Sequence, residues 1–261
     1  MKKNVKLWVT KTSKILMICG LSIISMSTTS FADTSSEAYT TGKISGYTYS
    51  FTSELWQRSF PEGKTIEAVN HISASKNVPT GYMGGQALLF TSSGDLRNAS
   101  SMTYNSESLA GFYVYSPRTT TGNSYYAQSK AEFYNGDGYT KFTGYKSPIQ
   151  SHPRLLSSSK SENPMMREIY DVNGNGETYG SALSEYTIGV EPDLISAIGI
   201  NEVKGYVRAD DLTPDVSSIE EAIDETSKND NIRTIPLYDV DGTTILGEFE
   251  LITNYEKEKK E

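Results

Sequence analysis

The sequence predicts a mainly β protein, with an N-terminal antiparallel β-sandwich followed by a small α+β domain. Several segments between residues 41 and 147 alternate apolar and polar side chains, and turn residues separate them. The charge also changes along the chain. Residues 33–160 contain 11 Lys and Arg against 9 Asp and Glu, whereas residues 161–261 contain 8 against 23. We therefore expect the sandwich over residues 33–150, a linker over 151–163 and an acidic α+β domain over 164–253.

The N-terminal segment, residues 1–32, has the pattern of an export signal. It contains five lysines and no acidic residue, an apolar run over residues 15–24, and small residues at Ser30 and Ala32. The apolar run is shorter than the ~20 residues that a membrane-spanning helix needs. We therefore expect a signal peptide cleaved after Ala32, a secreted or extracellular cell-surface protein, and no stable transmembrane segment after cleavage.

The cysteine content restricts the chemistry of the exported chain. Cys19 is the one cysteine in the sequence, and it lies in the signal. The processed protein would then have neither a disulfide nor a thiol nucleophile, although its compartment permits disulfides. An exported chain without cysteine fits a Gram-positive cell surface.

Three segments of the predicted sandwich have the period-two pattern of strands, which places alternate side chains on opposite faces. In Gly46–Phe51, three aromatic residues share one face, and in Thr65–Ser75 four apolar residues do. Ser124–Tyr134 is predicted to be half-buried. Its first face holds Tyr125, Ala127, Ser129, Ala131 and Phe133, and its second face holds Tyr126, Gln128, Lys130, Glu132 and Tyr134.

The C-terminal part has a mixed pattern. Lys204–Arg208 is predicted to be a strand, and Ser218 with Glu221 forms a capping box that begins a helix. A hairpin is predicted from Ile232–Tyr238 and Thr244–Leu251, because Asp241-Gly242 between them supplies a tight turn. Residues 254–261 are predicted to be a charged tail, and Glu256–Glu261 within it is predicted to fray.

Several motifs in the C-terminal part occur in an order that resembles a known module. They are Asn173–Ala182, Glu191–Ile195, Gly205–Arg208, Ile235–Asp239 and Gly247–Phe249. The module resembles one in uncharacterised exported proteins of low-GC Gram-positive bacteria, and in extracellular tails of membrane proteins of the β-lactam-sensor type. The resemblance implies no specific function, and peptidase activity is not implied because His-Glu-x-x-His is absent from the sequence.

One segment matches the opening of a calcium-binding loop. Asp171, Asn173 and Asn175 stand at ligand positions 1, 3 and 5, and Gly176 follows at position 6. Position 12 is Ala182, where a bidentate glutamate is needed. We therefore interpret the segment as an Asn-Gly turn, predict no metal or other cofactor, and keep these three residues as the metal candidates.

Catalytic groups are few, and the sequence assigns no catalytic residue. His71 and His152 are the two histidines, and the Gly-x-Ser-x-Gly motif of serine hydrolases does not occur. We expect His71 to be a partly exposed sheet residue and His152 to lie in the linker. A glycosidase would need a pair of carboxylates, for which Glu67, Glu107 and Glu132 are the strand-borne candidates of the β unit.

Tyrosines are the candidate ligand-binding residues. Of the 18 tyrosines, 12 lie in residues 33–160. Alternation places Tyr113 and Tyr115 on one strand face, and Tyr126 and Tyr134 on another. Exposed tyrosines bind sugars or proteins with a small entropy loss, but aromatic residues also favour strands for packing reasons alone.

The leading hypothesis is a secreted or cell-surface-associated, non-enzymatic protein that binds an envelope component or a protein partner. A secreted glycan-active hydrolase and a β-rich bacteriocin or toxin-like effector are the alternatives. The acidic C-terminal half would be repelled by nucleic acid phosphates, so nucleic acid is excluded as a partner. The sequence leaves the oligomeric state open.

Overall fold

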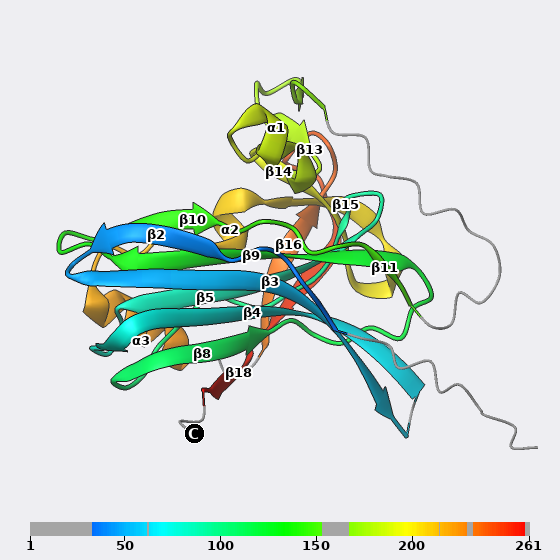
Figure 1. Ribbon diagram of the computed structural model, residues 1–261. Helices are drawn as coiled ribbons and strands as arrows, with labels where there is room; N and C mark the ends of the chain where they lie inside the picture. The colour runs from blue at the N-terminus through cyan, green and yellow to red at the C-terminus, as the bar shows by residue number, and fades with distance from the viewer. Residues whose placement is uncertain (1–32, 62, 153–166, 214, 229–231, 259–261) are drawn as a thin grey trace, which may run out of the picture. The chain divides into compact units, whose positions relative to one another are not determined.

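The computed structural model describes residues 33–61, 63–152, 167–213, 215–228 and 232–258. The predicted signal peptide and residues 153–163 of the predicted linker lie outside these ranges. The described chain is mainly β, as predicted, and its strands form large antiparallel and mixed sheets (Figure 1). Among the described residues, no helix is long and apolar enough to cross a membrane.

The first sheet, sheet A, is antiparallel. Its strand order is β1-β3-β4-β8-β18, and β2 pairs with β3 at one side. The strands of sheet A among the described residues are β1 (Thr34–Ser35), β2 (Tyr39–Ile44), β3 (Tyr47–Phe60), β4 (Gly63–Val78), β8 (Leu109–Tyr115) and β18 (Asn254–Lys257).

The second sheet, sheet B, is mixed, with order β10-β9-β5-β6-β17-β16-β15-β14-β13-β12, and β7 and β11 pair with β5 and β9. Its parallel pairs are β13 with β14, and β6 with both β14 and β17. The N-terminal strands of sheet B are β5 (Met83–Thr91), β6 (Leu96–Ala99), β7 (Thr103–Tyr104), β9 (Ser124–Tyr134), β10 (Tyr139–Thr143) and β11 (Gln150–Ser151). Its C-terminal strands are β12 (Asp171–Val172), β13 (Thr178–Gly180), β14 (Leu194–Ile198), β15 (Lys204–Arg208), β16 (Ile232–Tyr238) and β17 (Ile245–Ile252).

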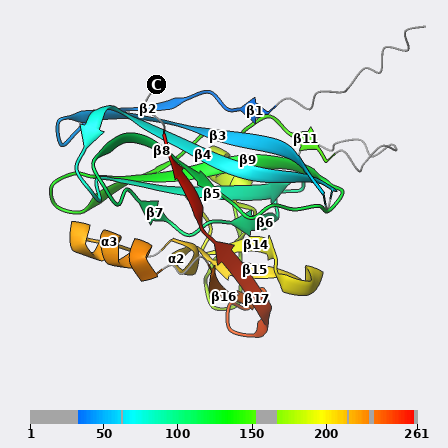
Figure 2. The same cartoon turned by 90° about the horizontal axis from the view of Figure 1, so that it is seen from below.

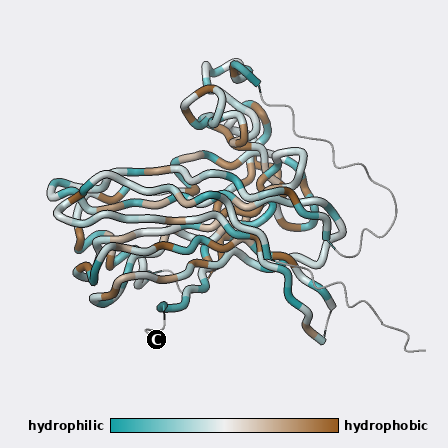
Figure 3. Tube along the Cα trace, viewed as in Figure 1, coloured by the Kyte–Doolittle hydropathy of each residue, from teal (hydrophilic) through white to brown (hydrophobic). Residues whose placement is uncertain are grey.

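The inward faces of the two sheets form a shared core. Apolar residues of β3, β4 and β8 form two buried clusters with residues of β5 and β9. The predicted faces of Gly46–Phe51, Thr65–Ser75 and Ser124–Tyr134 are confirmed, since their apolar sides point into these clusters. Along the long strands, hydrophobic and hydrophilic residues follow one another, as period-two strands require (Figure 3).

The prediction that β9 is half-buried was wrong, because both of its faces are covered. Tyr125 lies in a cluster between the sheets, while Tyr126 lies in a cluster with residues of β6 and of the C-terminal strands. Figure 2 shows β3, β4 and β8 on one side of β5 and β9, and β14–β17 with α3 on the other. Because a strand in the middle layer is covered on both faces, residues on its polar face are buried as well.

The predicted division into two domains is not confirmed. Residues 32–261 form one compact unit. Sheet B continues across the expected boundary, since Leu251 of β17 pairs with Ala99 of β6. The beginning of the predicted linker is also part of the sheet, because Ser151 pairs with Ser124 of β9.

The short helices lie in the C-terminal part. They are the 3-10 turns η1 (Ala182–Ser184) and η2 (Ile200–Glu202), and the α-helices α1 (Glu185–Ile188), α2 (Ala209–Leu212) and α3 (Ile219–Lys228). The predicted start of α3 is confirmed, because the Glu221 amide donates to Ser218 Oγ over 3.1 Å. The Glu221 carboxylate accepts from Ser217 rather than from Ser218.

The predicted strand Lys204–Arg208 and the predicted hairpin are confirmed as β15 and as β16 with β17, and Gly242 has φ +69° in the turn. The tail prediction was wrong for its first four residues, which form β18. Their backbone groups pair with the free edge of β8, with Asn254 opposite Tyr115. A charged strand is compatible with a sheet edge because its side chains remain in water.

Candidate functional site

Three aromatic side chains meet on the outer face of sheet A. Trp56 lies on β3, while Tyr113 and Tyr115 lie on β8, and β4 runs between these strands. Residues of β3 with inward side chains, such as Leu55, alternate with Trp56, so the indole points outward. Val69 on β4 lies between Glu54 and Tyr115 in the sheet, and it has an exposed fraction of 0% although it is outside the core clusters.

The rings are close enough to form one surface. The Trp56 ring centroid lies 5.5 Å from that of Tyr115 and 5.9 Å from that of Tyr113. The two tyrosine rings are 6.4 Å apart, and the His71 ring stacks on Tyr113 at 4.2 Å. All four side chains are partly exposed. The face therefore offers several π systems to a ligand at once.

Two open hollows adjoin at these rings. One, of about 740 Å³, extends from Trp56 toward Arg118 and the start of β18, and the other, of about 960 Å³, extends toward Tyr113 and Glu258. Trp56, Tyr115 and Glu256 line both hollows. We call the continuous surface bounded by these residues the aromatic groove.

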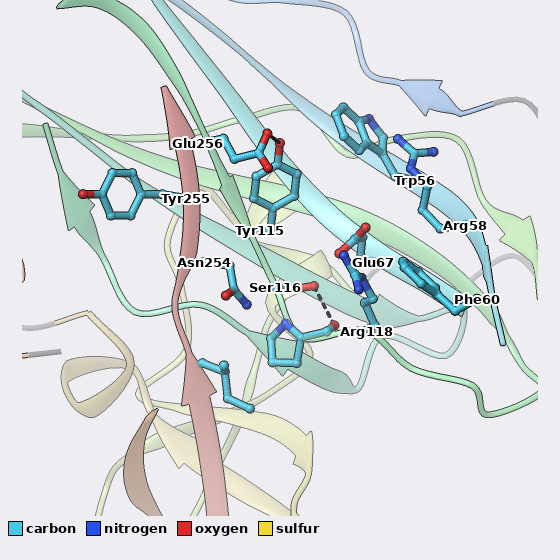
Figure 4. Close-up of a pocket in the computed structure, with 12 residues that line it drawn as sticks. Trp56, Arg58, Phe60, Glu67, Tyr115, Ser116, Arg118, Asn254, Tyr255 and Glu256 are labelled. Carbon is cyan, nitrogen blue, oxygen red and sulfur yellow. Dashed lines mark hydrogen bonds and ion pairs between the residues drawn. The ribbon is translucent and has the colours of Figure 1, made fainter. Parts of the chain in front are cut away.

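Carboxylates border the aromatic groove. Glu54 accepts a 2.7 Å hydrogen bond from the Trp56 indole N–H, and Glu256 lies 3.5 Å from the Tyr115 hydroxyl. Figure 4 shows Glu256 and Tyr115 pointing toward one another. Burial and the Glu256 charge raise the pKa of the Tyr115 phenol, and burial with Glu258 and Glu54 raises that of Tyr113. Carboxylates therefore lie beside both the indole and the tyrosine rings.

The arginines at the groove are each paired within the chain. Arg58 lies over the Trp56 ring, 4.3 Å from its centroid, and pairs with Asp33 at 2.8 Å. Arg118 pairs with Glu67 at 3.2 Å, beside the ring of Phe60 (Figure 4). Burial outweighs this arginine and raises the pKa of the Glu67 carboxyl.

The structure brings Tyr113 and Tyr115 together, but it places the other two predicted tyrosines elsewhere. Tyr126 has an exposed fraction of 0% and stacks on Phe90, so it has no surface for a ligand. Tyr134 lies on β9, with its ring 5.2 Å from that of Tyr82. Sequence reasoning missed Trp56, although the alternation of residues 47–51 continues to position 56 and places it on the outer face.

The side chains of the three metal candidates make hydrogen bonds or an ion pair with other residues of the chain. Asn173 Oδ1 accepts from the amides of Asn175 and Glu177, each over 2.9 Å, and Asp171 pairs with Arg167. The side-chain amides of Asn173 and Asn175 donate to carbonyls of the 239–242 turn. In the described part of the chain, no three His, Cys, Asp or Glu residues are grouped so that they could hold a metal ion.

The histidines occupy different environments. His71 lies between two carboxylates, with Nδ1 3.7 Å from Glu54 and Nε2 3.6 Å from Glu258, and is partly exposed as predicted. His152, predicted to lie in a linker, is instead 2% exposed, with Nε2 2.9 Å from the Lys64 carbonyl. It is held in the core by that contact and by the pairing of β11 before it.

Of the three predicted strand-borne acids, Glu67 lies on β4 and Glu132 on β9, but Glu107 lies between β7 and β8 and on no strand, because the chain bends there before β8 begins. Glu67 and Glu107 lie in the two parts of the aromatic groove, where Glu107 pairs with Lys257 at 2.7 Å. Glu132 lines a third hollow, of about 290 Å³, together with Glu185 and Glu191.

This third hollow contains two carboxyl groups with altered acidity. Glu132 is 1% exposed and accepts a 2.6 Å hydrogen bond from the Tyr104 hydroxyl. Burial raises the pKa of Glu132, and burial together with the charge of Glu191 raises that of Glu185. Lys130, which also lines the hollow, pairs with Glu191 at 2.6 Å.

No protein-family model, no curated protein and no solved structure matches this chain.

Proposed function

We propose that this is a secreted or cell-surface-associated, non-enzymatic protein that binds an envelope component or a protein partner through the aromatic groove. The meeting of Trp56, Tyr113 and Tyr115 on an open sheet face supports this proposal most directly. The lysine-rich N-terminal segment, with its short apolar run, supports export. The resemblance of the C-terminal motifs to exported Gram-positive proteins agrees with this location.

The physical reason is that large rings release much water on contact and lose little conformational entropy when they are held. Trp and Tyr are accordingly enriched among the residues that dominate binding energy in interfaces. In the groove, the rings are already held by their neighbours, with the Trp56 indole fixed by Glu54. A ligand would therefore meet a largely preformed surface.

Co-sedimentation of the purified full chain with cell envelopes tests the proposal. In a second assay, envelope extracts are passed over the immobilised protein and the retained material is measured. We expect Trp56→Ala and Tyr115→Ala to reduce retention by about tenfold, because truncation of a central aromatic residue costs 1 kcal/mol or more. Tyr186→Ala is the matched control, since Tyr186 is a 68% exposed tyrosine that does not line the groove. Retention that is equal in all variants would exclude the groove as the binding site.

A second candidate function is a secreted glycan-active hydrolase at the hollow of Glu132 and Glu185. The observation that favours it is that both carboxyl groups line one hollow and both have a raised pKa. A general acid must hold its proton at the working pH, which a raised pKa permits. Release of soluble reducing sugar from cell walls tests this function. Activity that is lost in both Glu132→Gln and Glu185→Gln would support it, whereas no release by the unmodified protein would remove it.

A further inference from the structure

The charges around the aromatic groove restrict the ligand that it can accept. Three carboxylates, Glu54, Glu256 and Glu258, lie beside the rings, within 3.7 Å of Trp56, Tyr115 or His71. They come from β3, from β18 and from the residue after β18. Three separate parts of the chain thus bring negative charge to one aromatic face.

The positive groups nearby are largely neutralised within the chain. Arg58 pairs with Asp33, Arg118 with Glu67, and Lys257 with Glu107. The ring of His71 lies between two of the carboxylates. Among the described residues, the two arginines and the lysine that line the groove are all paired, so an anionic ligand would meet Glu54 and Glu256 without an unpaired described arginine or lysine to compensate them, and the groove disfavours anions.

The rings themselves favour a cation. The face of an aromatic ring is negative, and a cation within about 6 Å of its centroid is attracted, most strongly by tryptophan. The groove already shows such contacts, since the Arg58 guanidinium lies 4.3 Å from the centroid of Trp56 and that of Arg118 lies 4.1 Å from the centroid of Phe60. Tyr115 stands at 68° to the indole, so the two rings present differently oriented π surfaces to one ligand.

On these grounds we propose that the aromatic groove binds an organic ammonium group against the exposed surfaces of Trp56, Tyr113 and Tyr115, with Glu54 and Glu256 supplying the opposite charge. This inference rests on the proposed binding function and names the chemistry of its ligand. A quaternary ammonium of the choline type and the side chain of a lysine both carry this group. The apolar part of either cation would contact the rings, while the carboxylates select for its charge.

The sequence provides a built-in reporter for this test. The chain has two tryptophans, Trp8 and Trp56, so the full chain with Trp8→Phe retains one indole, which lies in the groove. Emission of that indole is followed during titration with choline and with Nα-acetyl-lysinamide at constant ionic strength. Equilibrium dialysis of labelled choline measures binding independently of emission. The control ligand is 3,3-dimethylbutan-1-ol, in which carbon replaces the charged nitrogen of choline.

We expect saturable binding of at least one ammonium ligand, and at least about fivefold weaker binding of the neutral alcohol, the difference that a cation–π contact of about 1 kcal/mol provides. Tyr115→Ala and Glu256→Gln should weaken ammonium binding, and Tyr186→Ala should leave it unchanged. Stronger binding of choline than of the lysine derivative would identify a quaternary ammonium as the group that the groove prefers. The reverse order would identify a lysine side chain.

Two results would overturn the inference: no binding of either ammonium ligand, or equal binding of the neutral alcohol. Failure of the inference is distinguishable from failure of the proposed function. If envelopes or surface proteins are still retained in a Trp56-dependent way, the groove binds a ligand of other chemistry. If retention is also independent of Trp56, the binding function itself fails.

Discussion

Glu54 holds Trp56 in place from two residues earlier on the same strand. Since the two side chains share one face of β3, the carboxylate reaches the indole N–H at 2.7 Å, while Thr52 donates to its other oxygen at 2.8 Å. The same carboxylate lies 3.7 Å from His71 on β4. One acidic side chain therefore both orients the largest ring of the groove and contributes to its negative charge.

Replacing Glu54 should loosen the indole. In the Trp8→Phe background, Glu54→Ala removes the acceptor of the Trp56 N–H, so we expect red-shifted emission with lower anisotropy and a loss of about 1 kcal/mol in the free energy of unfolding. Fluorescence and urea denaturation measure these effects. Glu168→Ala, at an exposed position outside the groove, is the control. Unchanged emission and anisotropy would show that Glu54 does not fix the ring.

Removing the ring of Tyr126 should damage the fold rather than ligand binding. Tyr126 is completely buried among residues of β6 and the C-terminal strands, and Tyr126→Ala leaves a large cavity there. We expect a loss of about 3–5 kcal/mol in the free energy of unfolding, measured by urea denaturation. Tyr186→Ala removes an exposed ring and should change the same quantity by less than about 0.5 kcal/mol. Similar values for the two variants would contradict the burial of Tyr126.

The N-terminus of α3 gives a prediction about the cap. Ser218 Oγ accepts from the Glu221 amide, so Ser218→Ala leaves that amide without its side-chain partner. We expect a loss of about 1 kcal/mol, which lowers Tm by about 2–4 °C for a chain of this size. Ser227→Ala is the control within the same helix, because Ser227 bonds to the Ile223 carbonyl rather than to a free amide. Calorimetry compares the two, and an equal Tm in both would argue against a capping role.

Buried Glu132 should make stability depend on pH. Burial raises its pKa in the folded protein, so the folded state holds this proton more tightly than the unfolded chain, whose glutamate pKa is about 4.3. The stability from this proton is complete below the unfolded pKa and is lost as pH rises through the folded pKa.

Glu132→Gln keeps an acceptor for Tyr104 and carries no charge at any pH. We therefore expect its free energy of unfolding, relative to the unmodified protein, to increase as pH rises from the unfolded pKa of about 4.3 through the raised folded pKa. Urea denaturation across this range measures the difference, and Glu168→Gln controls for removal of an exposed carboxylate. A difference for Glu132→Gln that does not change with pH would mean that Glu132 titrates alike in both states.

Local patterns in the sequence predicted the elements correctly where the signal lies within one segment. Alternation in Ser124–Tyr134 gave β9 and its inward face, the Ser218 cap gave α3, and Asp241-Gly242 gave the hairpin. The failures concern contacts with distant segments. Asn254–Lys257 was assigned to the charged tail, yet it forms β18 because the edge of β8 offers free backbone groups.

The candidate site shows the same difference between local signals and contacts with distant segments. Alternation predicted that Tyr113 and Tyr115 share a face, and the structure confirms this arrangement. It could not predict that Trp56 joins them, since this depends on the register of β4 against both β3 and β8. Nor could it distinguish Tyr115 from Tyr126, because both follow the same pattern and only the layers stacked on each strand decide which is buried.

By itself, therefore, the sequence determined the mainly β class, the faces of individual strands, the α3 cap and the acidic character of the C-terminal half, because these follow from the spacing and type of neighbouring residues. The tertiary structure decided that sheet B continues through both halves, that Tyr126 is core, and that Trp56, Tyr115 and Glu256 line one groove. Strand pairing and layer packing join residues that are up to 200 positions apart, as with Trp56 and Glu256, and no local pattern specifies such contacts.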